Sequence, residues 1–246
     1  MITSGLANMI GNSIVGGHPS PGGAFENQYS CDFDGIDDSI EIGNPANLQL
    51  TGAMTMSFWF KGQPTSTGHY AGFDKLGNTS NRGAGLDLRK GTGIYFFVTG
   101  SFLLSTHTSD PTPLTDGNWH HVAGVYIPST SMKLYLDGVE VASRTISVPA
   151  AQSNVGSNPW SIGKRSAHSN FMNGKIDEVS IFSSALNISD LWDGSTKPTD
   201  LTSLSPLGWW RNGDNNGGAG TTVTDEGSGG NNGTLLNGTS FSTDVP

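Results

Sequence analysis

The stretch DGNWHHVAGVYIPSTSMKLYLDGVEVA, residues 116–142, decides the fold class of this chain. It contains three runs rich in β-branched and aromatic residues, at 119–127, 132–136 and 139–142. Residues typical of turns separate the three runs. The stretch therefore predicts consecutive β-strands rather than helix.

The second and third runs are joined by Asp137 and Gly138. An Asp-Gly pair supplies the two positive φ angles that a type I′ turn requires, so we expect a tight hairpin here. Met132, Leu134 and Leu136 share one face of their strand, because successive side chains of a strand point to opposite sides. One face of the hairpin is therefore expected to be buried.

Similar runs occur on both sides of this stretch, at 54–60, 93–98 and 175–182. About twelve short strands are expected in all. A single short helix is expected near 184–191, before Gly194. A chain with many short strands and almost no helix favours an all-β fold in which two antiparallel sheets form a sandwich.

The composition agrees with many strands joined by turns. Gly accounts for 35 of the 246 residues, and charged residues make up only 13%. The single cysteine, Cys31, excludes an internal disulfide, so the fold is expected to be held by burial, with or without a metal.

The charge and the apolar segments of the chain indicate which classes of partner are not expected. Its formal net charge is −9, and its twelve Lys and Arg residues are dispersed without a run. We therefore expect no nucleic-acid partner. No segment approaches the roughly 20 apolar residues of a membrane span, so no membrane insertion is expected. Residues 1–23 lack the features of a secretory signal.

Three zones are visible along the chain. Residues 1–27 are predicted to form an N-terminal arm rich in Gly, Ser and Pro. Residues 28–193 carry the dense strand pattern and are predicted to be the sandwich domain. Residues 194–246 form a Gly/Asn-rich tail, expected to pack on the sandwich or on a neighbouring subunit.

Three segments together resemble the laminin G-like, concanavalin A-like lectin/glucanase superfamily. The first is FDGIDD at 33–38, which SIEI and later SFWFKG follow. The second is DGNWHHVA at 116–123, which leads into LYLDGVEVA. The third is Ile162-Gly163 followed by GKIDEVSIF at 174–182.

The resemblance implies a jelly-roll sandwich in which the N- and C-terminal strands lie side by side. It is typical of domains in bacterial surface proteins and in tailed-phage virion proteins. The tail sequence GWWRNGDNNGG at 208–218 is also similar to a segment that often follows this domain in phage structural proteins.

Asp34, Asp38 and Asp177 are the candidate metal ligands. By strand parity, Asp38 aligns with Ile40, and Asp177 with Val179, so both acids are expected at the start of inward-facing rows. An ionised carboxylate at the rim of a core needs compensation. One solution is a structural Ca2+, which the resemblance also implies. In the alternative, the acids accept backbone N–H groups or pair with His121 or Lys175.

No constellation predicts catalysis. The E-x-D-x-x-E strand motif of glucanase relatives is absent, and Asp177 and Glu178 are adjacent in a strand and so are expected to diverge. No G-x-S-x-G elbow is present, and Cys31 has no base nearby in sequence. His120 and His121 are expected on opposite faces of their strand, with His121 in the core. We therefore expect a protein that is not an enzyme.

Sugar binding requires exposed aromatic rings and polar groups that bond hydroxyls. Tyr70, Trp160 and Trp192 are the candidate ligand-binding residues. The alternative is that the tryptophans of this chain serve the core or anchor the tail. The fold by itself does not locate a ligand site.

The sequence favours a non-enzymatic structural protein of a tailed-phage virion, such as a capsid decoration, head-fibre or tail adhesin subunit. Its expected partners are other virion proteins or copies of itself in a homo-oligomer or symmetric array, and a host surface glycan. The alternative is a carbohydrate-binding module or adhesin at a bacterial cell surface. The arm 1–27 and the tail are the expected docking elements of the virion protein.

Overall fold

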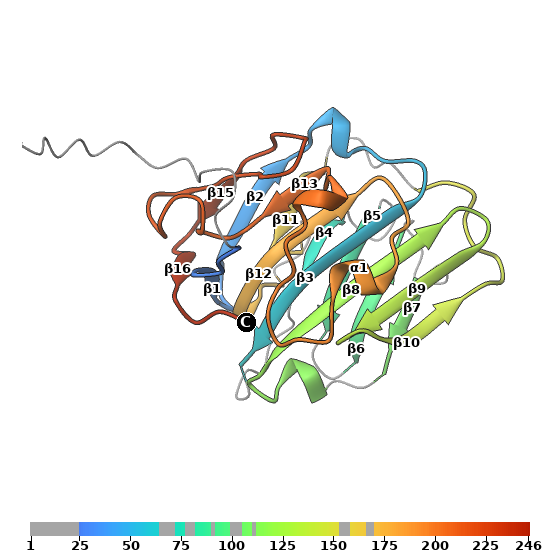
Figure 1. The fold of residues 1–246 in the computed structure, drawn as a ribbon, viewed down its shortest axis with the longest axis horizontal. Coiled ribbons are helices and arrows are strands. Elements are labelled where there is room, and N and C mark those ends of the chain that lie inside the picture. The colour runs from blue at the N-terminus through green and yellow to red at the C-terminus, as the bar shows by residue number, and fades with distance from the viewer. Residues whose placement is uncertain are drawn as a thin grey trace, which may run out of the picture.

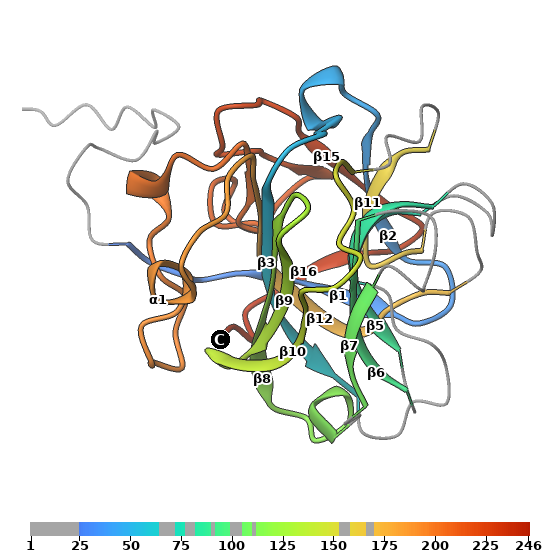
Figure 2. The ribbon, with the colours of Figure 1, turned by 90° about the vertical axis from the view of Figure 1, so that its right-hand side faces the viewer.

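Two antiparallel sheets of eight strands each form the body of the protein in the computed structural model (Figure 1). The structure describes residues 25–63, 72–76, 82–89, 92–98, 105–109, 112–152, 158–165 and 170–246. Figure 2 shows the two sheets edge-on as separate layers. The all-β sandwich predicted from the sequence is confirmed.

The first sheet, called sheet A, has the strand order β10-β9-β8-β3-β12-β1-β16. β13 pairs with residues 179–181 of β12, beyond the part of β12 that pairs with β1. Its strands are β1 (Ser30–Asp34), β3 (Met54–Gly62), β8 (Trp119–Ile127), β9 (Ser131–Leu136), β10 (Val139–Arg144), β12 (Asn173–Phe182), β13 (Gly208–Trp210) and β16 (Ser240–Ser242).

The second sheet, called sheet B, has the strand order β14-β15-β2-β11-β4-β5-β6-β7. Its strands are β2 (Ser39–Gly43), β4 (Phe73–Leu76), β5 (Arg82–Arg89), β6 (Gly93–Phe97), β7 (Ser105–Thr108), β11 (Trp160–Ile162), β14 (Thr222–Val223) and β15 (Gly233–Leu236).

The main core lies between the sheets and follows the two-residue period of the strands. On β3, Met54, Met56, Phe58 and Phe60 are fully buried members of this core. Fully burying one such side chain stabilises a fold by about 1.5–3 kcal/mol. Trp210 of sheet A reaches Phe73 of sheet B, with the ring centroids 5.4 Å apart, so aromatic contacts join the layers.

A second apolar cluster covers the opposite face of sheet A. The predicted helix forms as one turn, α1 (Ile188–Leu191), within the expected range. Figure 2 shows α1 on the side of sheet A that points away from sheet B. Leu191 packs there with Phe182 and Trp209. Among the described residues, no helix has the length and hydropathy needed to cross a bilayer.

The C-terminal segment is part of the sandwich. β16 pairs with β1, β15 pairs with β2, and β13 pairs with β12. Residue 193 is therefore not a structural boundary, and the tail adds strands to both sheets of its own chain. The side-by-side placement of N- and C-terminal strands agrees with the resemblance found in the sequence.

The boundary predicted for the N-terminal arm, at residue 27, also changes. Residues 1–24 lie outside the described residues, but Phe25 packs on Trp209, and the amide of Asn27 bonds the carboxylate of Asp177. Residues 25–27 therefore belong to the folded domain.

The β9–β10 hairpin has the predicted turn. Asp137 has φ 47° and Gly138 has φ 75°, both in the left-handed region. A Cβ atom on Gly138 would lie 2.1 Å from the ring of Trp192, so this glycine is required by its contact as well as by its backbone angle.

We expect Gly138→Ala to lower the free energy of unfolding by about 2–4 kcal/mol, because left-handed strain and the clash with Trp192 add. Gly220→Ala is the control, since Gly220 has φ 80° and no atom within 4 Å of an added Cβ. It is expected to cost about 1 kcal/mol. Urea denaturation measures both, and equal losses would show that the Trp192 contact is not limiting.

Candidate functional site

The loop between β1 and β2 is built around the carboxylate of Asp34. Its Oδ1 accepts the backbone N–H of Ile36 at 2.8 Å and that of Asp37 at 3.4 Å. Gly35, with φ 79°, allows the chain to turn back at this point. The loop is therefore a tight turn that brings its acidic residues together.

Asp38 closes the loop from its buried side. Its Oδ2 accepts the backbone N–H of Asp34 at 2.9 Å. The residue is only 4% exposed, and its Oδ1 has no hydrogen-bond partner. Burial raises the pKa of Asp38, and the charges of Asp34 and Asp37 add to the effect. An oxygen in this state needs a proton or a cation.

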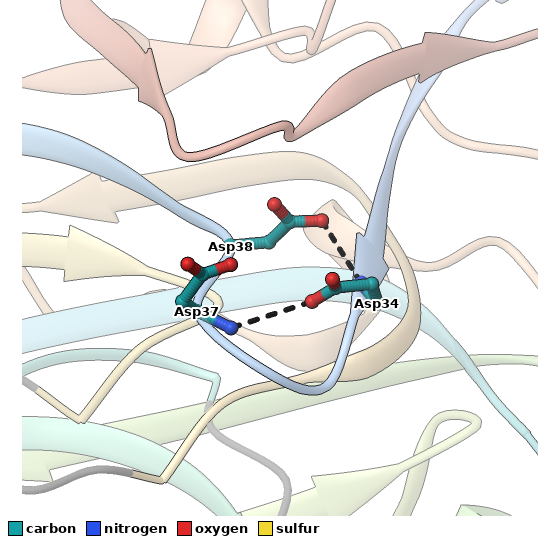
Figure 3. A group of neighbouring side chains, drawn as sticks. All are labelled: Asp34, Asp37 and Asp38. Carbon is teal, nitrogen blue, oxygen red and sulfur yellow. Dashed lines mark hydrogen bonds between the residues drawn. The ribbon is translucent and has the colours of Figure 1, made fainter.

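Figure 3 shows the side chains of Asp34, Asp37 and Asp38 gathered around one small volume. One carboxylate oxygen from each lies within 4.8 Å of the others. A donor set of hard oxygens fits Ca2+, which binds carboxylates and backbone carbonyls in flexible geometry. Asp37 was missed as a ligand in the sequence, although the FDGIDD motif contains it.

Asp177 does not belong to this site, so the predicted set of Asp34, Asp38 and Asp177 is wrong as a single centre. Asp34 is opposite Asn173 on β12, whereas Ile176 is opposite Cys31. At about 3.3 Å per residue, the four positions between 173 and 177 amount to roughly 13 Å along the strand.

A β-bulge explains why parity misplaced Asp177. Asp177 is opposite Trp59 and Ser180 is opposite Ser57, so β12 has one extra residue between them. The extra residue is Glu178, whose φ is 49°. The alternation of side chains between the two faces of β12 shifts by one residue across the bulge, so Asp177 and Glu178 do not point to opposite faces. Both lie on the outer face of sheet A with Trp59 and Trp209, opposite the side of Val179.

Of the alternative partners considered for these acids, backbone N–H groups are used by Asp34, Asp38 and Asp177, whereas Lys175 and His121 have other neighbours. Lys175 contacts Asp32 at 3.3 Å and Asp244 at 3.9 Å. His121 packs beside Trp59, with the ring centroids 5.4 Å apart, and burial lowers its pKa to about 4. His121 is therefore a neutral, buried histidine, as expected, although it lies on the outer side of sheet A.

The three candidate sugar-binding residues have different outcomes. The prediction that Trp160 binds sugar is wrong. Trp160 is 2% exposed, packs on Phe73 in the core and donates its indole N–H to the carbonyl of Leu48. Tyr70 lies outside the described residues. Trp192 is half-buried and reaches the surface.

Trp192 forms part of an open hollow of about 480 Å3. Its ring stands against Gly138 of the β9–β10 turn, and α1 ends immediately before it. Ser189 and Asp193 supply the polar side chains of the hollow, and Ile188 and Gly194 complete the lining. The arrangement combines an accessible aromatic ring with one hydroxyl and one carboxylate.

Sheet B presents a second polar surface that the sequence reasoning missed. The guanidinium carbon of Arg89 lies 4.1 Å from the centroid of the Tyr95 ring. The ring of His107 stacks on Tyr95, with the two ring centroids 4.8 Å apart. Asp87 pairs with Arg89 at 2.8 Å. The alternation of Asp87 and Arg89 with buried Leu86 and Leu88 was the signal that could have revealed this outward row.

His120 links the rim of the sandwich to the hairpin below Trp192. Its Nδ1 lies 2.7 Å from Asp137 Oδ2, and its Nε2 lies 3.0 Å from Asp116 Oδ2. Burial opposes the charged ring, but the two carboxylates outweigh it and raise the pKa of His120. The protonated ring therefore ties the turn to the preceding loop.

Face-to-face antiparallel sheets with an aromatic surface hollow and an acidic rim loop define a lectin-like β-sandwich domain. The sequence profile described as "Concanavalin A-like lectin/glucanases superfamily" matches residues 34–191. The chain belongs to this superfamily. No curated protein sequence matches it at a significant level.

The chain is also similar to solved structures, to different degrees. An inferred carbohydrate binding protein from Bacteroides ovatus superposes with a TM-score of 0.65 at 17% identity, over 90% of this chain and 62% of its own. This chain thus spans less than two thirds of that protein. The CBM40 of Ruminococcus gnavus IT-sialidase, bound to alpha2,3 sialyllactose, gives a TM-score of 0.48 at 12% identity, over 65% of this chain and 94% of its own.

The His120 contacts predict a specific pH dependence of stability. Because the folded-state pKa is raised, their contribution is complete below the unfolded pKa near 6.5 and is lost as the pH rises through the folded value. His120→Gln should therefore cost about 1 kcal/mol at pH 6, after allowance for solvent screening, and less at pH 9. Urea titrations at both pH values measure the difference.

His107→Gln is the matched control, since His107 is an exposed histidine on the other sheet. The comparison removes any effect that is common to replacing a histidine of the sandwich. A cost of His120→Gln that stays constant from pH 6 to pH 9 would contradict the assigned role.

Proposed function

We propose that this domain is a non-catalytic carbohydrate-recognition module that stacks a sugar ring on Trp192. The observation that carries the proposal is the half-buried indole in an open hollow with Ser189 and Asp193. Sugar sites combine an apolar ring face with a few placed polar groups, which these three residues supply. The superfamily of the chain and the carbohydrate binding assigned to the Bacteroides ovatus protein support the proposal.

The absence of a catalytic step is part of the proposal. Glycoside hydrolysis requires two carboxyl groups that flank the scissile bond. Among the described residues that line the hollow, Asp193 is the one acid. Asp177 and Glu178 are nearly fully buried beneath residues 25–29 and bonded to protein donors, so they do not face this hollow.

We further propose that Asp34, Asp37 and Asp38 hold a structural Ca2+. The bound ion would neutralise the partnerless Oδ1 of Asp38 and fix the β1–β2 loop. A cation that binds the folded state alone stabilises that state.

The virion role remains a prediction from the sequence. On this prediction the Gly-rich ends become ordered on contact with neighbouring subunits. The C-terminal segment instead pairs with β1 and β2 of its own chain. The C-terminal segment is therefore held within its own chain, and a truncation that tests the N-terminal arm ends before Phe25 rather than after Asn27.

We expect a glycan array probed with the purified protein to give binding that Trp192→Ala abolishes and Trp192→Phe retains in weaker form. The smaller ring of Phe keeps a stacking surface, whereas Ala removes it. At least a tenfold loss of affinity for the Ala variant, equal to about 1.4 kcal/mol, is expected. Thermal melting of each variant checks that the hairpin under the ring stays folded.

An array without any bound glycan, or equal binding by Trp192→Ala and the parent protein, would refute the carbohydrate site.

For the metal, saturating Ca2+ should raise the melting temperature by roughly 5 °C relative to EDTA. Asp38→Asn should abolish this shift, because it removes the buried anionic oxygen. Asp177→Asn should leave the shift intact, since Asp177 lies elsewhere on β12. A shift that survives Asp38→Asn, or one that disappears with Asp177→Asn, would show that the ion binds elsewhere.

A further inference from the structure

Residues 25–29, here called the latch, cross the outer face of sheet A without belonging to any strand. The ring of Phe25 stacks on Trp209 at 6.2 Å, and the guanidinium of Arg211 lies 4.4 Å from the Phe25 ring. Further along, the backbone N–H groups of Gln28 and Tyr29 donate to Asp214 Oδ1 at 2.8 and 2.7 Å.

The latch covers the bulge of β12. Asn27 donates its amide N–H to Asp177 Oδ2 at 3.0 Å, and the backbone N–H of Glu178 donates to Asp177 Oδ1 at 2.8 Å. Asp177 is 0% exposed and Glu178 is 3% exposed. The latch thus attaches directly to a carboxyl pair that has almost no contact with solvent.

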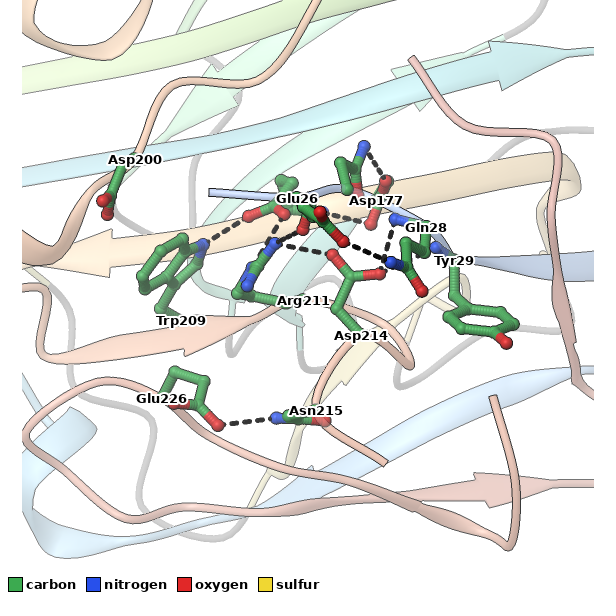
Figure 4. Close-up of polar contacts among 12 residues, drawn as sticks. Glu26, Gln28, Tyr29, Asp177, Asp200, Trp209, Arg211, Asp214, Asn215 and Glu226 are labelled. Atoms are coloured by element: carbon green, nitrogen blue, oxygen red, sulfur yellow. Dashed lines mark hydrogen bonds and ion pairs between the residues drawn. The ribbon is translucent and has the colours of Figure 1, made fainter. Parts of the chain in front are cut away.

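Two of the acids of this region bond the guanidinium of Arg211, which lies beside Asp214 in Figure 4. Arg211 Nε donates to Glu178 Oε1 at 3.0 Å, and Arg211 Nη2 donates to Asp214 Oδ2 at 2.6 Å and to the backbone carbonyl of Glu26. The indole N–H of Trp209 donates to Glu178 Oε2 at 2.6 Å.

The titratable and charged groups that face the bulge come from every element around it. They are Glu26 of the latch, Asp177 and Glu178 of β12, and Arg211 and Asp214 after β13, with Asp200 and Glu226 at the edge of the group. The buried thiol of Cys31 in β1 lies on the inner side of sheet A, opposite Ile176 of β12.

A single guanidinium cannot balance the three buried carboxylates of Asp177, Glu178 and Asp214. An ionised carboxylate without a counter-charge is costly away from water, so such groups hold protons instead. Burial raises the pKa of Asp177 well above its usual range, and the charge of Glu178 raises it further. Burial also raises the pKa of Glu178 to about 7, against the opposing effect of Arg211. Burial raises the pKa of Asp214 as well.

The direction of the pH effect follows from these raised values. Protonation of the acids stabilises the closed arrangement fully below their unfolded pKa values, and this stabilisation is lost as the pH rises through the folded ones. β12 is held by ladders to β3 on one side and to β1 and β13 on the other. The latch has no ladder, so repulsion among the acids displaces the latch first.

We propose that residues 25–29 are a proton-dependent latch. The latch is closed on sheet A while the carboxyl pair of Asp177 and Glu178 at the β12 bulge holds a proton, and it is released when both carboxyl groups are ionised in alkaline solution.

Release has a defined structural consequence. Phe25 leaves Trp209, and the cavity of about 480 Å3 between the latch, residues 197–198 and residues 245–246 opens onto the outer face of sheet A. The backbone at Phe25 is then no longer fixed to sheet A.

Amide hydrogen exchange of Gln28 and Tyr29 in the full chain tests the proposal. After correction for the intrinsic pH dependence of exchange, protection of both amides should fall at least tenfold between pH 6.5 and pH 9. The amides of β3 and β8 are the internal reference and should keep their protection. In Asp177→Asn/Glu178→Gln, which cannot ionise at the bulge, protection of Gln28 and Tyr29 should be the same at both pH values.

Glu140→Gln, which removes an exposed acid of β10 outside the group, should show the same loss of latch protection as the parent protein. If the double variant does not fold, Glu178→Gln alone should still move the loss of protection to higher pH. The proposal is overturned if the parent protein keeps its protection at pH 9, if β3 and β8 lose theirs together with the latch, or if the neutral variants lose protection as the parent does.

Discussion

Backbone pairing along β1 and β2 is the constraint on which this domain depends. Both strands place apolar side chains in the core, such as Phe33 and Ile40, so their peptide groups need partners on each side. β12 and β11 supply one side, and β16 and β15 supply the other. The C-terminal segment therefore completes both sheets, and the acidic loop and the latch lie beside the strands that it completes.

The strand pattern was readable in the sequence because it reflects local chemistry. The Asp137-Gly138 turn and the alternation along β3 each specify backbone geometry without reference to distant residues. The role of residues 194–246 could not be read in this way. Gly and Asn are common in flexible segments, and the pairing of β15 and β16 depends on strands roughly 200 residues earlier in the chain.

The candidate site was predictable where the ligands are close in sequence and unpredictable where they depend on register. Asp34 and Asp38 share one loop and were found together. Asp177 was misplaced because a left-handed residue at Glu178 resets the parity of β12, and two-residue periodicity cannot detect a bulge. Trp160 and Trp192 have equal aromatic character, and only the packing distinguishes the buried ring from the accessible one.

Phe25 and Pro246 line the same cavity, so the first and last residues of the described part of the chain meet on one face of the molecule. A short linker between them would close the chain into a ring without disturbing either sheet. The chain could then be reopened at an exposed turn as a circular permutant. The same closeness allows the whole sandwich to be grafted into a surface loop of a host protein.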